Sequence, residues 1–141
     1  MAELGVISGS LGIVSLALQV SESVMKLKFF LDSVKDAPDE INYTIGQIEA
    51  LDLVLSSADV HEYDDDSSEA TAAAMRTSKV FLVQAARALE TSVKDLDLAI
   101  GKRKKVGSFK AVLKQSVIEK LKQRLRDAQD LLVLSNQYYS Q

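Results

Sequence analysis

The chain lacks cysteine and tryptophan, and its 141 residues include one proline and one histidine. Without cysteine the protein has no disulfide framework and little means of building a zinc site, which fits a reducing intracellular compartment. Aromatic residues make up only 6% of the sequence. Because Ala, Leu, Lys and Glu are abundant and proline is scarce, we expect long helices and an all-α fold.

Residue patterns that support catalysis are also missing. His61 lies in an acidic stretch without a cysteine partner, so we interpret it as a surface residue. Asp64, Asp65 and Asp66 lack the glycine and the distal glutamate of a calcium loop. The sequence contains neither a glycine-rich phosphate loop nor a nucleophile elbow. We therefore expect a protein that is not an enzyme and that binds no cofactor and no metal.

Residues 4–21 form a stretch without any charge, and nine of them are Leu, Ile or Val. As a helix this stretch would extend about 27 Å, close to the roughly 30 Å thickness of a bilayer core. Gly5, Gly9 and Gly12 recur within it at spacings that let helices approach closely. No Lys or Arg precedes the stretch, so we do not expect a cleaved secretory signal.

Hydrophobic periodicity predicts four helices. In the longest one, apolar residues alternate at spacings of about three and four, which is typical of bundle packing, and these residues are Met75, Leu82, Ala86, Leu89, Val93, Leu96 and Ile100. Pro38 followed by two acids predicts a helix start, and Gly101 a helix end. The expected segments are an apolar N-terminal helix over 3–34, a helix over 38–58, an acidic loop over 59–66, a helix over 67–100, a basic link over 101–107 and a helix over 108–139.

These segments predict a single domain over 1–141, an antiparallel four-helix bundle, with five helices as the alternative. A bundle helix needs only one apolar stripe, whereas the apolar residues of the uncharged stretch point in every direction. We therefore expect the first helix at the centre of the bundle, or with an apolar face kept for another partner.

Charge is distributed unevenly along the chain. The net charge is -3, but residues 101–126 hold ten Lys or Arg against one acid, a local charge of +9 that leaves -12 elsewhere. A solvated face is one interpretation, and a nucleic-acid site is disfavoured because no aromatics interleave the cations. The other interpretation is contact with anionic membrane lipids, for which the candidate residues are Lys102, Arg103, Lys104, Lys105, Lys110 and Lys114.

The opening residues, MAELGVISGSLGIVSLALQVSESV, resemble the HeLo-like N-terminal domain of fungal NOD-like receptors and related cell-death effectors. This family is similar in architecture to the four-helix bundle of mixed-lineage kinase-like necroptosis effectors. The resemblance implies that the bundle oligomerises and that its N-terminal apolar helix inserts into the plasma membrane. The residues to which it assigns insertion are Leu4, Gly5, Val6, Ile7, Gly9, Leu11, Gly12, Ile13, Val14, Leu16 and Leu18.

The same resemblance implies a location and a set of partners. The protein would be cytoplasmic at rest and move to the plasma membrane when activated, where it would meet anionic lipids and further copies of itself. An upstream receptor or an amyloid signalling partner would provide the trigger. The alternative function is a non-lytic interaction module that assembles a signalling receptor through helix contacts and never enters lipid.

Overall fold

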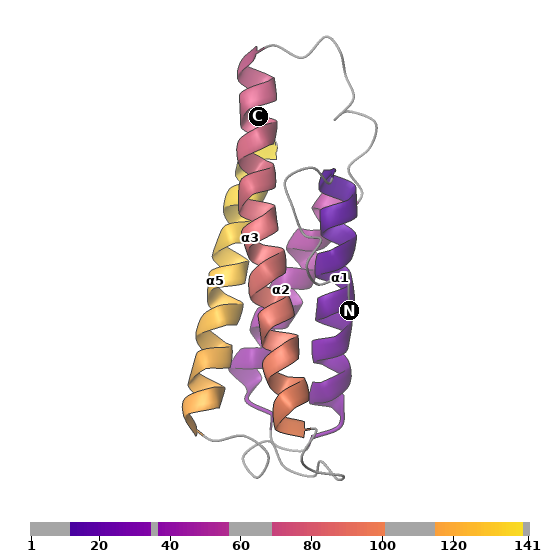
Figure 1. Ribbon diagram of the computed structural model, residues 1–141, viewed down its shortest axis with the longest axis vertical. Helices are drawn as coiled ribbons and strands as arrows, with labels where there is room; N and C mark the ends of the chain where they lie inside the picture. The colour runs from indigo at the N-terminus through magenta and orange to yellow at the C-terminus, as the bar shows by residue number, and fades with distance from the viewer. Residues whose placement is uncertain (1–11, 35–36, 57–68, 101–114, 140–141) are drawn as a thin grey trace.

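The described part of the chain is an all-helical bundle without strands (Figure 1). The computed structural model describes residues 12–34, 37–56, 69–100 and 115–139. Its helices are α1 (Ile13–Asp32), α2 (Asp39–Ser56), α3 (Glu69–Ile100) and α5 (Gln115–Tyr139). The predicted all-α class is confirmed.

Each helix has two principal neighbours. α1 packs on α2 and α3, and α5 packs on the same two helices, so α1 and α5 occupy opposite corners. In Figure 1, α1 and α3 run downwards, whereas α2 and α5 run upwards. The pairs α1/α2 and α3/α5 therefore run in opposite directions, while α1 and α3, and likewise α2 and α5, run in the same direction. The finer prediction of an antiparallel bundle around a central first helix is not confirmed.

The core is made by the stripes that periodicity predicts. In α3, Leu82, Ala86 and Leu89 are fully buried, with Leu96 close to that limit. The stripes of the other helices are buried in the same way, because each turns one apolar face inward; they include Val24, Leu27, Leu31, Ile41, Ile45, Ile48, Leu55, Leu121, Leu125, Ala128 and Leu132.

The start of α1 differs from the predicted helix over 3–34. Gly12 is the N-cap of α1, with φ -72° and ψ 165°, and its carbonyl accepts the first helical hydrogen bond from the Leu16 amide at 3.0 Å. A residue in this extended conformation cannot lie inside a helix, so a helix does not continue unbroken through Gly12. Residues 1–11 lie outside the described residues.

The other predicted helices, 38–58, 67–100 and 108–139, agree with α2, α3 and α5 over the described residues. Pro38 stands just before α2, and its carbonyl accepts hydrogen bonds from the amides of Ile41 and Asn42. The proline and the two acids that follow it therefore mark this helix start as expected. The acidic loop over 59–66 and the basic link over 101–107 lie outside the described residues.

Candidate membrane-contact surface

The described residues among those assigned to insertion fall into three groups. Ile13 and Leu16 are fully buried in the core, Gly12 and Val14 are half-buried, and Leu18 is exposed. The remaining candidates lie outside the described residues: Leu4, Gly5, Val6, Ile7, Gly9 and Leu11. Four of the five described residues in this set are therefore buried or half-buried.

The candidate lipid-binding cations all lie outside the described residues. They are Lys102, Arg103, Lys104, Lys105, Lys110 and Lys114. The structure does describe other cations, which lie on α3, the long helix that leads into this basic segment.

The outer face of α1 carries two large apolar side chains that are exposed to solvent. Phe29 is 80% exposed, and Met25, one turn earlier, is also exposed. Sequence periodicity had assigned neither residue, because both fall outside the stripe that contains Val24 and Leu27. The pair Phe29 and Phe30 was a usable signal, since adjacent helical residues cannot both face one core.

The exposed side chains of α1 border an apolar hollow against α3. The hollow has a volume of about 470 Å³. Met25, Leu27, Phe29 and Phe30 line it from α1, and Val93 and Leu96 from α3, while Lys26, Ser33 and Asp97 complete its lining. It is an open groove on the surface between two helices, with an apolar floor.

Cations follow the outer face of α3. Exposed residues recur every third or fourth position along this face, at 76, 80, 84, 87, 91, 94 and 98, and the exposed Asp97 stands beside the last of them. We call Arg76, Arg87 and Lys94 on this face, with the half-buried Lys79, the basic stripe of α3. Arg76 forms an ion pair with Glu69 at 3.5 Å, but both partners are exposed, so this pair holds the arginine only weakly.

The basic stripe meets α1 at Glu90. Partial burial raises the pKa of Glu90, with a smaller contribution from the charge of Glu22, while the positive charges of Lys26 and Lys94 act against this rise. Glu22 and Lys26 also approach each other within α1, at 3.8 Å. The α1/α3 side therefore combines exposed apolar side chains with several cations, some of which are balanced by local acids.

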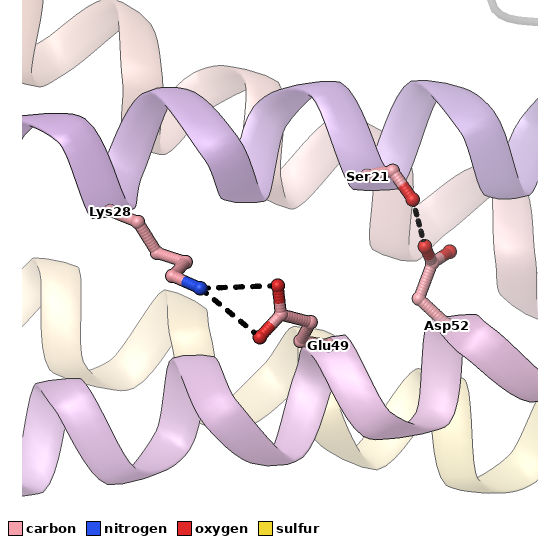
Figure 2. A network of polar contacts seen from close by, with 4 residues as sticks. All are labelled: Ser21, Lys28, Glu49 and Asp52. Atoms are coloured by element: carbon pink, nitrogen blue, oxygen red, sulfur yellow. Dashed lines mark hydrogen bonds and ion pairs between the residues drawn. The ribbon is translucent and has the colours of Figure 1, made fainter.

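Two polar contacts hold α1 on α2 (Figure 2). The Ser21 hydroxyl donates a hydrogen bond to Asp52 Oδ2, and the Lys28 ammonium contacts both carboxylate oxygens of Glu49 at 3.2 and 3.3 Å. Ser56 adds a longer hydrogen bond to Asp52 at 3.4 Å. Any movement of α1 away from the bundle has to break these contacts as well as expose its buried apolar face.

Asp52 is the least favourable member of this network. Its side chain is buried, and desolvation raises its pKa, although the hydrogen bonds from Ser21 and Ser56 act in the opposite direction. Its second oxygen, Oδ1, has no hydrogen-bond partner among the described residues. A buried carboxylate with one unsatisfied oxygen costs stability, so this part of the α1/α2 contact is weaker than an apolar one.

Neither a metal-binding group nor a membrane-spanning helix is found among the described residues. Across 12–34, 37–56, 69–100 and 115–139, no group of three or more His, Cys, Asp or Glu is placed to hold a metal ion. Within those same ranges, no helix is both long and apolar enough to cross a membrane. His61 lies outside them.

Comparisons with known proteins leave the function to be argued from this geometry. No protein-family model, curated protein or solved structure matches the chain.

Proposed function

We propose that the chain is a HeLo-like helical bundle that binds anionic membranes and permeabilises them when several copies associate, as the effector domain of a fungal immune-type receptor. The observation that carries the proposal is the α1/α3 side, which combines the exposed Phe29 and Met25 of α1 with exposed cations of α3. The resemblance of the N-terminal sequence to this family points in the same direction.

The chemistry of this side suits the surface of an anionic bilayer. A cation near such a surface contributes about 1 kcal/mol of binding free energy, and full burial of a Phe or Met side chain contributes about 1.5–3 kcal/mol. The basic stripe leads along the chain into the cations of residues 102–105. Shallow binding with the bundle closed is therefore the first step that we propose.

Permeabilisation requires a second step, in which the N-terminal segment leaves the bundle. In this proposal the resting state is a four-helix bundle that covers Ile13, Leu16 and Val20, all fully buried. Release of α1 exposes these residues and breaks the contacts of Ser21 and Lys28 with α2. The cost keeps a single copy closed, and contacts between copies on the membrane shift the population towards the open state.

Location and partners follow from this mechanism. The protein resides in the cytoplasm at rest and acts at the plasma membrane. Its partners are anionic lipids, other copies of the chain, and an upstream receptor or amyloid signal that brings copies together.

One observation favours a second candidate function, a non-lytic interaction module. The outer face of α2 exposes Tyr43 and Leu53, and no exposed charged residue lies between them. Such a face suits a helix of another protein molecule better than a charged lipid surface.

Binding to vesicles tests the proposal. We expect the full chain to sediment with vesicles that contain phosphatidylserine, and Phe29→Glu to weaken this binding about tenfold or more, because it places a negative charge on the contacting face. Val133→Glu on α5, at the opposite corner from α1, is the matched control and should bind as the wild type does. Equal binding by both variants would remove the α1/α3 side as the membrane contact and favour the interaction module.

A further inference from the structure

α2 is apolar on two opposite faces. Its inner face supplies the fully or almost fully buried Ile41, Ile48 and Leu55 to the core. Its outer face carries Tyr43 and Leu53, whose side chains are 68% and 64% exposed. A helix that is apolar on both faces normally has a partner on both.

The outer residues form a regular stripe. Tyr43, Gly46, Ala50 and Leu53 are all exposed and recur at intervals of three, four and three residues. This is the spacing of one helix face, and none of the four is charged. We call these four residues the outer stripe of α2.

Two charged neighbours of the stripe form ion pairs within the chain. Glu49 pairs with Lys28 of α1, and Glu40 pairs with Arg126 of α5. A partner that covers the outer stripe therefore meets acids that already have counter-charges, so no unpaired charge has to be desolvated at these two positions.

Nothing in the described part of the chain requires a glycine at position 46. A methyl group built on Gly46 meets nothing within 4 Å among the described residues. Glycine in the middle of a helix lowers its stability relative to alanine. A second helix that approaches closely at this point supplies the missing reason, because small residues allow helix backbones to come near each other.

The order of sizes in the stripe identifies the second helix. Read in either direction along α2, the stripe is large, small, small, large, and its centre lies at residue 48. We propose that α2 packs against α2 of a second copy in the opposite direction, across a two-fold axis. Tyr43 then packs on Leu53 of the partner subunit, and Gly46 lies against Ala50 of the partner subunit.

Such an interface is self-complementary, as a two-fold dimer requires. One helix face per copy is smaller than the roughly 800 Å² per partner of a standard stable interface. We therefore expect a weak, reversible dimer that forms at high micromolar concentration and is strengthened where copies are concentrated on a surface. The inference gives a surface to the self-association in the proposed function and rests on that function for its biological role.

Sedimentation equilibrium of the full chain without lipid tests the pairing. We expect a monomer–dimer equilibrium whose Kd rises at least tenfold in Leu53→Glu, because the charge would lie inside the interface. Leu98→Glu is the matched control, since Leu98 is 70% exposed on α3, away from the stripe, and its Kd should equal that of the wild type. A chain that stays monomeric up to millimolar concentration, or equal effects of the two variants, would overturn the inference.

Disulfide trapping tests the direction of the pairing, since the chain has no cysteine of its own. A mixture of Gly46→Cys and Ala50→Cys proteins, oxidised with copper phenanthroline, should form the mixed disulfide in several-fold excess over either homodimer. Predominant homodimers would indicate parallel helices and contradict the proposed register. Gln84→Cys, exposed on α3, gives the background rate of random collision.

The two proposals fail separately. Loss of dimerisation in solution together with intact vesicle permeabilisation would reject the α2 pairing and leave the proposed function standing. Intact pairing without permeabilisation would reject the proposed function and make the interaction module the better account.

Discussion

At the scale of single residues, Asp52 has the most direct link between environment and stability. Its carboxylate is buried between α1 and α2, and its contacts to Ser21 and Ser56 satisfy one oxygen only. Hydrophobic periodicity did not single it out because it is an acid, although its spacing of four from Ile48 and three from Leu55 places it on the buried face of α2.

The raised pKa of Asp52 predicts a pH-dependent stability. In the unfolded chain an aspartate ionises near pH 3.9, whereas the folded protein holds its proton to a higher pH. Between these two values the folded state binds more protons, so the contribution of Asp52 to stability falls as pH rises and stays low at neutral pH.

Asp52→Asn removes this dependence. The amide oxygen can accept the same serine hydrogen bonds without a buried charge, so we expect the variant to be more stable at pH 7 by roughly 1 kcal/mol and equal to the wild type below about pH 3.9. Urea unfolding followed by circular dichroism at several pH values measures this difference. Asp130→Asn is the control, because Asp130 is exposed on α5. An Asp52→Asn protein that is less stable than the wild type at pH 7 would show that the charge of Asp52 stabilises the fold.

At the scale of helices, the buried apolar stripe of α3 predicts the effect of a substitution in the core. Leu89 is fully buried in the middle of the longest helix. Leu89→Asp places an unpaired charge in the core, and we expect it to cost more than about 4 kcal/mol and to unfold the domain. Thermal melts of Leu89→Asp and of Leu98→Asp, where the residue is exposed, make the comparison. Unchanged melting of the first variant would mean that the stripe faces another way.

Periodicity predicted these helices well because packing in a bundle follows the helical repeat. In α3 the predicted Leu82, Ala86, Leu89 and Leu96 are buried, whereas Met75 and Val93 are half-buried and the buried Ser78 and Ala85 lie outside the predicted stripe. The start of α1 was not predictable in this way, because Gly12 lies within the uncharged stretch and only its extended backbone marks where α1 begins. The outward residues Phe29 and Tyr43 were also missed, since an apolar residue outside a stripe carries no periodic signal.

The candidate site was predicted less well than the fold. The basic segment and most insertion residues lie outside the described residues, so those predictions stay open. Ile13 and Leu16, assigned to insertion, contribute to the core of the closed bundle. An apolar side chain is compatible both with burial in a protein core and with insertion into lipid. Composition alone therefore does not distinguish a core residue from an inserting one.

At the scale of the whole molecule, the proposed membrane contact predicts a dependence on the basic segment. Lys102, Arg103, Lys104 and Lys105 together can supply about 4 kcal/mol on an anionic surface, on the order of a thousandfold in affinity. We expect their joint replacement by alanine to weaken binding to anionic vesicles at low salt, with the difference shrinking as salt is added. Equal binding of both proteins at low ionic strength would exclude this segment as the lipid contact.

Dye release from vesicles that contain phosphatidylserine tests the central claim most directly, with the full chain compared against a chain that lacks residues 2–11. This deletion leaves intact the core residues that start at Ile13, which a longer one would remove. Equal thermal melting of the two proteins is the condition for the comparison. We predict that the full chain releases dye with a more than linear dependence on its concentration, and that the shortened chain binds the vesicles without releasing dye. Equal release by both chains, or binding of the full chain without release, would contradict the account.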